Sequence, residues 1–271
     1  MLDRPVIVDE LDGMGLVLIG SVHSLREPAR EIIKKITTLS PDYVCVELSA
    51  PLQPTKSFEL EMARERYLDR FVCIDRPIEV TISRYMSGTR PIDFLKEAVV
   101  KYFYLPFNVA SIIAFNNFSG LYKKLTGGRF FTFGWSEWDS RAYIFERDEY
   151  MAGRLASMLK SGELRGRCAV LVGRRHLPGM KCILEAFKST NDIGSYYAGG
   201  RVYEVFSLAE LEEPYTLSYE ESSRNFLRNR LIEAVVRAIF LSSYVLALFL
   251  LLAALILMAT AGALILIKGK L

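Results

Sequence analysis

A run of 30 residues without a charged side chain lies near the end of this 271-residue sequence, from Ala238 to Ile267 (AIFLSSYVLALFLLLAALILMATAGALILI). About 20 apolar residues cross the hydrocarbon core of a bilayer, so the run is long enough for one tilted helix and too short for two. A central helix of a soluble protein is the alternative, but such a helix seldom tolerates apolar residues on every face over this length. The sequence therefore predicts a transmembrane helix over residues 238–267.

The charges around this run predict how the chain is oriented. Four arginines precede the run and two lysines follow it: Arg224, Arg228, Arg230 and Arg237, then Lys268 and Lys270. Because positive residues favour the cytoplasmic side, the N-terminal part is expected in the cytoplasm. The first residues, MLDRPVIVDELDG, carry early acids and lack the apolar core of a signal peptide. We expect a single-pass protein of the cell membrane, with a domain over residues 1–213 and a linker helix over residues 214–237.

Composition limits the function of the N-terminal part. The chain is 51% hydrophobic, which is ample for a large core, and its net charge is +3. No basic run or repeated aromatic and arginine pattern is present, so no nucleic-acid partner is expected. The four cysteines form no C-x-x-C pair, and we expect buried, reduced thiols at Cys45, Cys73, Cys168 and Cys182.

The apolar periodicity predicts an α/β fold. Short β-branched runs alternate with segments of helical spacing, which indicates a mostly parallel or mixed sheet. Residues 6–19 are expected to form a strand or a hairpin with a turn at Gly13 and Gly15, and further strands are expected in residues 41–49, 70–77, 169–172 and 200–208. The expected helices lie in residues 26–38, 58–70, 78–86, 92–104, 138–159 and 181–188.

Residues 106–125, PFNVASIIAFNNFSGLYKKL, are apolar, aromatic and interrupted by asparagines. The segment is judged too short and too polar to cross a bilayer. A helix that covers the sheet is one interpretation, and a helix that lies on the membrane surface is the other.

The two histidines of the chain occur in matching motifs. LVLIGSVHS (residues 16–24) and AVLVGRRHL (residues 169–177) each contain an apolar run, a glycine and, three positions later, His23 or His176. Each strand–glycine–turn–helix unit places its turn at the carboxyl end of a strand, where open α/β sheets hold their ligands. The pattern suggests a duplicated core with one shared site, although so loose a motif also recurs by chance.

Further polar residues follow the other expected strands. Glu47 ends VCVEL, and Asp75 and Arg76 follow FVCI. Two histidines and a glutamate form the ligand set of several catalytic zinc sites, and manganese, cobalt or iron would accept the same set. A bound ion could activate water and polarise a scissile carbonyl, with activity falling below about pH 6 as the histidines protonate. Structural histidines and a Glu47 that only pairs with Arg76 or Arg147 are the alternatives.

Five ordered motifs resemble the TraB/PrgY family of pheromone-shutdown proteins, which is related to the Tiki metalloproteases and to the erythromycin-esterase/ChaN-like group. These motifs are LIGSVH, PDYVCVEL, CIDRPIEVTISR, FERDEYMAGRL and VLVGRRHLPGM. The resemblance covers residues 15–180 and the C-terminal hydrophobic region. It implies a duplicated α/β core in which His23, Glu47 and His176 line one metal site.

The resemblance also implies further site residues and an activity. Glu146, Arg147 and Asp148 match the E-R-D stretch of the family, and Asp75 and Arg76 match its D-R step. The Tiki relatives imply metal-dependent peptide cleavage. The expected cofactor is a divalent ion, which could be zinc, manganese or cobalt. The TraB/PrgY members imply that a peptide pheromone is sequestered or degraded.

Two departures from the family pattern affect the expected activity. Arg174 and Arg175 stand where small residues usually separate the glycine from the histidine, and two guanidiniums would repel a metal unless they point away or bind an anion. The arginine that commonly follows the glutamate is absent after Glu47.

Three functions therefore stay open. They are a membrane-anchored metal-dependent peptidase or hydrolase, a non-catalytic membrane-associated peptide-binding or regulatory protein, and an anchored scaffold with structural histidines. The expected partners are the bilayer and a peptide or protein ligand. Small residues near Ala253 and Ala261 allow a homodimer, but no G-x-x-x-G motif supports it.

Overall fold

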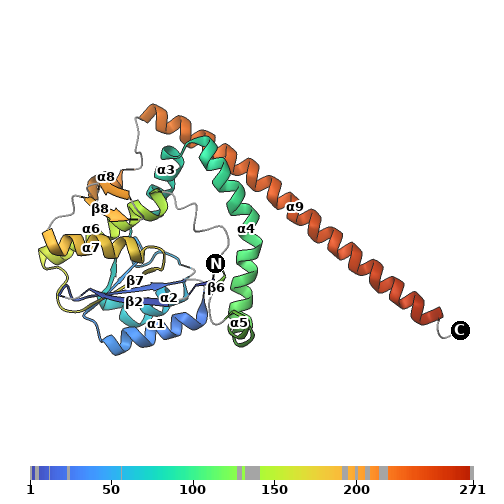
Figure 1. Cartoon of the computed structure of the whole chain (residues 1–271), viewed down its shortest axis with the longest axis horizontal. Coiled ribbons are helices and arrows are strands. Elements are labelled where there is room, and N and C mark those ends of the chain that lie inside the picture. Colours follow the sequence, from blue (N-terminus) through green and yellow to red (C-terminus); the bar gives the residue numbers. More distant parts are fainter. Residues whose placement is uncertain are drawn as a thin grey trace.

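The structure, a computed structural model of the chain, describes residues 2–3, 6–11, 13–22, 25–55, 57–126, 130–131, 141–190, 195–198, 201–204, 208–213 and 219–268. Figure 1 shows an α/β domain from which one long helix, α9 (Tyr219–Lys268), extends. The predicted α/β class is confirmed. The two segments expected as a linker helix and a transmembrane helix are parts of this one helix from Tyr219 onward.

A five-stranded mixed sheet forms the centre of the domain. The strands in spatial order are β2 (Val6–Leu11), β3 (Leu16–Ser21), β7 (Cys168–Gly173), β4 (Tyr43–Val46) and β5 (Phe71–Cys73). Strand β2 is antiparallel to β3, and the other four strands are parallel to one another. The carboxyl ends of four strands therefore lie at one edge of the sheet, as the motif analysis predicted.

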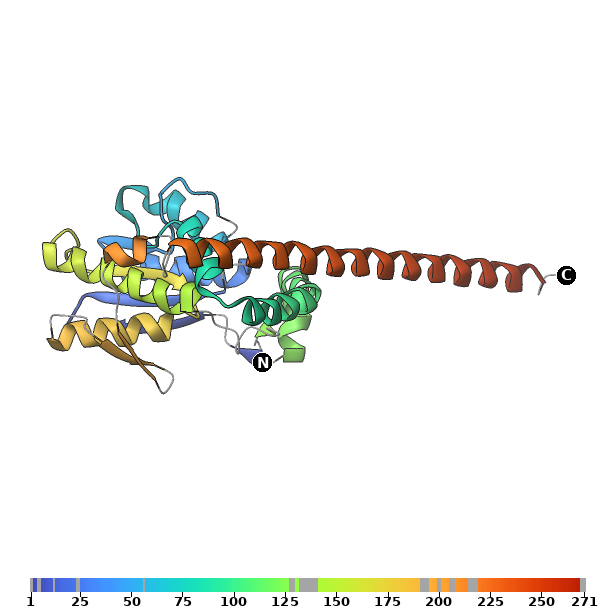
Figure 2. The ribbon, with the colours of Figure 1, turned by 90° about the horizontal axis from the view of Figure 1, so that it is seen from above.

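Helices cover both faces of this sheet, as Figures 1 and 2 show. Helices α1 (Arg26–Leu39) and α2 (Phe58–Tyr67) bury apolar side chains against one face, together with Val17, Ile19 and Val44. Helices α6 (Glu146–Ser161) and α7 (Leu177–Thr190) bury theirs against the other face. Alternate strand residues thus enter two separate cores, which explains why the strands read as continuous apolar runs.

The two G-x-x-H motifs begin on neighbouring parallel strands, with their glycines offset by one residue. Gly20 of β3 pairs with Val172, and Gly173 of β7 pairs with Ser21. A Cβ atom on Gly20 would lie 2.8 Å from Leu177 Cδ1 and 3.1 Å from Arg174 Cα. The glycine of the first motif therefore lets the turn of the second motif pack directly against it.

The remaining elements connect or extend this domain. They are β1 (Leu2–Asp3) paired with β6 (Phe130–Phe131), the short helices η1 (Leu68–Arg70), α5 (Ser119–Thr126), η2 (Arg141–Phe145, a π-helix) and α8 (Leu208–Glu212), and the pair β8 (Ser195–Ala198) and β9 (Arg201–Glu204). The strand expected in residues 200–208 is present as β9, but its expected place in the main sheet is wrong. Strand β9 is antiparallel to β8 in a sheet of its own.

A helical assembly stands beside the domain, formed by α3 (Ile78–Gly88), α4 (Pro91–Asn117) and the first part of α9. Met86, Phe94, Tyr102 and Val236 are buried where the three helices meet. The break expected between residues 86 and 92 is confirmed, whereas the separate helix expected from Pro106 is wrong. Helix α4 continues through Pro106 and packs on α9, so it does not cover the sheet.

The continuation of α4 through Pro106 has a physical cause. Proline has no N–H group, so the carbonyl oxygen of Tyr102, four residues earlier, loses its helical donor. The hydroxyl of Tyr244 on α9 donates to this oxygen at 2.5 Å. The partner helix thus replaces the hydrogen bond that proline removes.

The joined helix also changes the judgement that this region is too short to cross a membrane. By length and composition α4 is long and apolar enough to cross a membrane, and 28% of its most apolar window is buried.

Candidate active site at the carboxyl edge of the sheet

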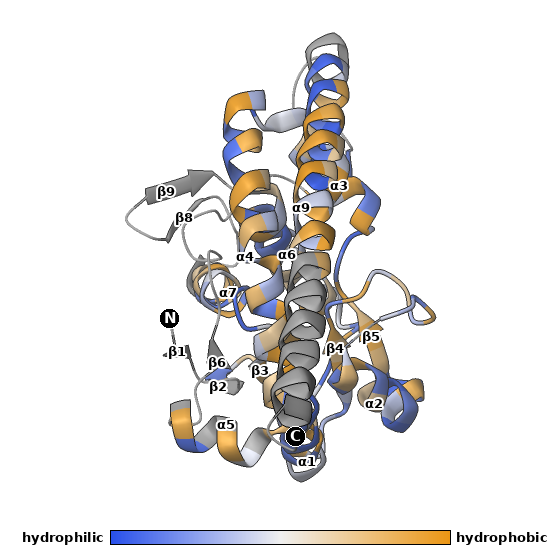
Figure 3. Cartoon of the chain, turned by 90° about the vertical axis from the view of Figure 1, so that its right-hand side faces the viewer, coloured by the Kyte–Doolittle hydropathy of each residue, from blue (hydrophilic) through white to orange (hydrophobic). Residues whose placement is uncertain are grey.

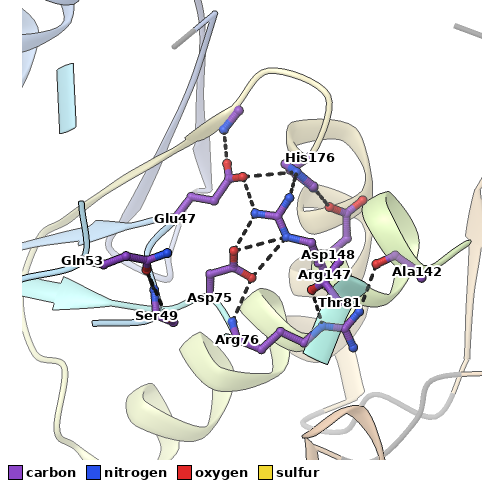
Figure 4. A network of polar contacts seen from close by, with 11 residues as sticks. Glu47, Ser49, Gln53, Asp75, Arg76, Thr81, Ala142, Arg147, Asp148 and His176 are labelled. Atoms are coloured by element: carbon purple, nitrogen blue, oxygen red, sulfur yellow. Dashed lines mark hydrogen bonds and ion pairs between the residues drawn. The ribbon is translucent and has the colours of Figure 1, made fainter. Parts of the chain in front are cut away.

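Five polar side chains from four elements meet at the carboxyl edge of the sheet (Figure 4). We call them the edge cluster: Glu47, Asp75, Arg147, Asp148 and His176. Glu47 directly follows β4, Asp75 follows β5 after one residue, and His176 lies in the turn after β7. Arg147 and Asp148 come from the first turn of α6, where the helix dipole favours the carboxylate.

The Arg147 guanidinium is the centre of the edge cluster. Its Nη2 group donates to a carboxylate oxygen of Glu47 and, at 2.5 Å, to Asp75 Oδ2. Its Nε group lies 3.2 Å from the same Asp75 oxygen, and Nη1 lies 3.2 Å from His176 Nε2. One cation thus contacts residues that follow three neighbouring strands.

His176 and Glu47 are each held by a second partner. His176 Nδ1 lies 2.6 Å from Asp148 Oδ1, which directs Nε2 toward Glu47 Oε1 at 3.4 Å. The other oxygen of Glu47 accepts the backbone N–H of Gly173 at 2.5 Å. Asp148 therefore fixes the orientation of the His176 ring, and the Gly173 N–H fixes that of the Glu47 carboxylate.

The charges of the edge cluster shift its protonation equilibria. Burial alone would lower the pKa of His176, but Glu47 and Asp148 outweigh burial and raise this pKa to about 9. Burial raises the pKa of Asp148 to about 6, although the neighbouring imidazolium lowers it. Burial would also lower the pKa of Arg147, and Glu47 and Asp75 raise it instead. At neutral pH the cluster therefore contains an imidazolium, and the pH limit near 6 expected from an ordinary histidine moves upward.

A second group of buried charges lies behind the edge cluster. We call Arg76, Arg84 and Glu146 the support cluster. Glu146 Oε2 accepts from Arg84 Nε at 2.6 Å and from Arg76 Nη2 at 3.3 Å. Arg76 also donates from Nε to the Thr81 hydroxyl at 3.0 Å.

The support cluster binds backbone as well as side chains. Arg76 donates to the carbonyls of Leu211 and Ala142, both at 2.9 Å, and Arg84 donates to those of Glu210 and Glu213. The contacts with Glu210, Leu211 and Glu213 satisfy carbonyl groups at the end of α8, which lack helical donors, and the contact with Ala142 holds η2.

The predicted site residues therefore separate into two groups. The structure brings together Glu47, Asp75, Arg147, Asp148 and His176, and it places Arg76 and Glu146 in the support cluster. The predicted convergence of Glu47 and His176 is confirmed. His23 lies outside the described residues, so its predicted place in the site stays a prediction.

The fit of a metal ion can be judged from the two described candidate ligands. Two ligands of one tetrahedral ion with bonds of about 2.0–2.1 Å lie about 3.3 Å apart, close to the 3.4 Å between Glu47 Oε1 and His176 Nε2. Asp148 on Nδ1 is the carboxylate partner that a metal-binding histidine commonly has. Within the described ranges, no group of three or more His, Cys, Asp or Glu side chains could hold an ion. Glu47 and His176 thus fit two positions, and Arg147 contacts both.

Three residues near the site are not identified by the sequence reasoning. Buried Glu59, in the first turn of α2, accepts a hydrogen bond from Ser21 at the end of β3. Arg84 binds Glu146, as described above. A Cβ atom on Gly179 of α7 would lie 2.0 Å from Asp148 Oδ2, so this glycine makes the space for Asp148. Two sequence signals could have identified two of them: Glu59 is an acid in the first turn of a helix, and Gly179 lies three residues after His176.

No family model matches this chain, and no curated protein or solved structure matches it either. The site is therefore defined by its geometry: buried carboxylates, a guanidinium and an imidazole at the carboxyl edge of an α/β sheet.

We predict that His176 titrates near pH 9 and that Asp148→Asn lowers this pKa, because the substitution removes one of the two carboxylates that stabilise the imidazolium. The folded pKa lies above the unfolded value of about 6.5, so this interaction stabilises the fold fully below about pH 6.5 and is lost as pH rises through about 9. NMR of histidine-labelled protein measures the titration, since the chain has two histidines and His176→Gln assigns the signals.

Asp9→Asn is the matched control, since Asp9 lies on β2 and pairs with Lys181 rather than with a residue of the edge cluster. This control should leave the titration unchanged. A His176 signal that titrates at or below about 6.5 would contradict the described electrostatics.

Proposed function

We propose that this chain is a membrane-anchored protein of the TraB/PrgY kind that hydrolyses peptides with the help of a divalent ion at the edge cluster. The observation that carries the proposal is the pair Glu47 and His176, whose facing atoms have the separation of two ligands of one ion while Asp148 and Gly173 hold their other atoms. His23 is the proposed third ligand. Zinc, manganese and cobalt all suit such a set.

The residues of the edge cluster divide the work of binding and orientation. Asp148 holds the imidazole ring, and the Gly173 N–H holds the Glu47 carboxylate, so neither ligand must be ordered when the ion arrives. A bound ion supplies a water that loses a proton near neutral pH. Arg147 would keep its contacts with Asp75 when an ion is bound. Its positive charge would then attract a carbonyl oxygen or a carboxylate of the peptide.

The raised pKa of His176 adds a condition to this function. A metal ligand must present an unprotonated nitrogen, so protons compete with the ion for Nε2. Because the pKa of His176 is about 9, ion affinity should still increase between pH 7 and 9.

A second candidate function is a peptide-binding or regulatory protein without catalysis. The contacts of the cluster favour it, because Arg147 donates to Glu47 and Asp75 while Asp148 and Glu47 hold the His176 imidazolium, so the network is complete without an ion. In that case an acidic group of a peptide would compete with these carboxylates for Arg147.

We also propose that residues 238–267 of α9 cross the membrane and that residues 1–213 face the cytoplasm. The 30 charge-free residues, as a helix, measure about 45 Å, which exceeds the roughly 30 Å hydrocarbon core. The arginines before this segment support the orientation. A homodimer through the small residues of this segment stays a prediction.

We predict that the full-length protein binds Zn²⁺, Mn²⁺ or Co²⁺ and cleaves peptides, and that Glu47→Gln weakens ion binding and reduces cleavage by about a hundredfold or more because a charged ligand is lost. Calorimetry measures ion binding, and mass spectrometry of a defined synthetic peptide mixture measures cleavage. EDTA should abolish cleavage and added ion should restore it.

Glu10→Gln is the matched control, since it makes the same chemical change at an exposed carboxylate that pairs with Arg167. Cleavage that persists through both EDTA and Glu47→Gln would refute the ion-dependent site. Peptide binding without cleavage would instead support the second candidate.

For the anchor, we predict that protease digests the α/β domain in sealed inverted membrane vesicles, whose cytoplasmic side faces outward, and not in right-side-out vesicles. Digestion of both after detergent is the control for protease access. Full protection of the domain in the inverted vesicles would show that the proposed orientation is wrong.

A further inference from the structure

A second apolar surface lies beside the proposed anchor, on α4. Figure 3, which views the chain from the side of α4 and α9, shows apolar residues along α4 and along the coloured first part of α9. Five large side chains of α4 after Tyr102 are between 41% and 53% exposed: Phe103, Leu105, Phe107, Val109 and Ile113. The α/β domain and α9 therefore leave this apolar face of α4 accessible.

The charges of α4 stop at a definite position. All four charged residues of this helix lie before Tyr102, namely Asp93, Lys96, Glu97 and Lys101. From Tyr102 to Tyr122 the sequence contains no charged residue, and Lys123 and Lys124 follow. The charge-free part of α4 thus resembles the charge-free part of α9 in having a sharp boundary.

The contacts between the two helices place these boundaries at the same level. Lys101 Nζ lies 3.7 Å from Glu233 Oε1, one turn before the last charge of the linker segment, Arg237. Just beyond, the rings of Tyr102 and Phe240 stack with centroids 6.4 Å apart. Next, the Tyr244 hydroxyl donates to the Tyr102 carbonyl. Both helices therefore leave their charged regions together.

Aromatic rings gather at this boundary. Tyr104 lies against Phe103 and Phe107, with ring centroids 5.0 and 6.4 Å away, and Phe240 lies 6.1 Å from Tyr244. Aromatic side chains are enriched at membrane–water interfaces, where an apolar body and a polar tip meet different surroundings. The shared level at which the charges of both helices end favours a membrane surface, because a groove that binds a protein would not require it.

We propose that the exposed face of α4 from Phe103 to Ile113 lies in the interfacial region of the same bilayer that α9 crosses. This inference rests on the proposed anchor, because α9 sets the level of the membrane. The Tyr244 hydrogen bond and the Lys101–Glu233 ion pair hold α4 at that level, and the apolar side chains enter the acyl boundary as in other interfacial helices. The α/β domain, with its edge cluster, is then held against the membrane surface at two places.

The test uses the full-length protein in vesicles of phosphatidylcholine and phosphatidylglycerol. Phe107→Cys and Ile113→Cys variants carry an environment-sensitive fluorophore, and Val245→Cys reports on the anchor. Leu52→Cys is the matched control, since Leu52 is an apolar residue of the domain that is 84% exposed. The protein without an added cysteine gives the background labelling, because its own cysteines are buried or partly buried.

We expect emission at positions 107 and 113 to shift to the blue and to be quenched by spin-labelled lipids about as strongly as at position 245, and at least about twice as strongly as at position 52. Quenching at 245 with positions 107 and 113 equal to 52 would overturn the α4 inference and leave the anchor intact. Absence of quenching at 245 as well would refute the anchor. A blue shift at 107 and 113 that lipid quenchers do not reach would indicate a second copy of the chain on this face, and would also overturn the inference.

Discussion

The interaction of Arg147 with Glu47 and Asp75 makes this arrangement of strands compatible with a buried site. Parallel strands place the residues after β4 and β5 at one edge, so two carboxylates must lie near each other in a region that is mostly shielded from water. Carboxylates without a cation would be costly there. The guanidinium donates to both carboxylates, and its planar shape suits several simultaneous hydrogen bonds.

The edge cluster is joined to the helices that we place near the membrane. Asp75 accepts the backbone N–H of Arg76 at 2.8 Å, and Arg76 in turn binds α8, which precedes α9 in the chain. Glu146, next to Arg147, binds Arg84 of α3, and α3 packs on α9. Movement of α3 or α9 would therefore disturb the side chains that support Arg147, which gives the site a direct physical connection to the proposed anchor.

Local patterns in the sequence were sufficient for the strands of the five-stranded sheet, most helices and the candidate residues. The hairpin at Gly13 and Gly15, both with positive φ, and the meeting of Glu47 with His176 were predicted and confirmed. The course of α4 was predicted wrongly, because Pro106 reads as a helix start and the compensating Tyr244 hydroxyl comes from a residue 142 positions away. The separate roles of Arg76 and Arg147 were equally hidden, since only the packing of α8 and α6 determines which guanidinium faces which carboxylate.

A double-mutant cycle between Arg147 and Asp75 tests the central claim most directly. In denaturant unfolding, Arg147→Met should cost about 3–5 kcal/mol because it leaves buried carboxylates without their cation. Adding Asp75→Leu should recover part of that loss, with a coupling energy of about 1–3 kcal/mol. The exposed pair Arg167 and Glu10, with side chains 47% and 58% exposed, gives the matched cycle, where coupling should stay below about 1 kcal/mol. Additive losses at Arg147 and Asp75, within about 0.5 kcal/mol, would contradict the account of Arg147 as the cation that holds the site together.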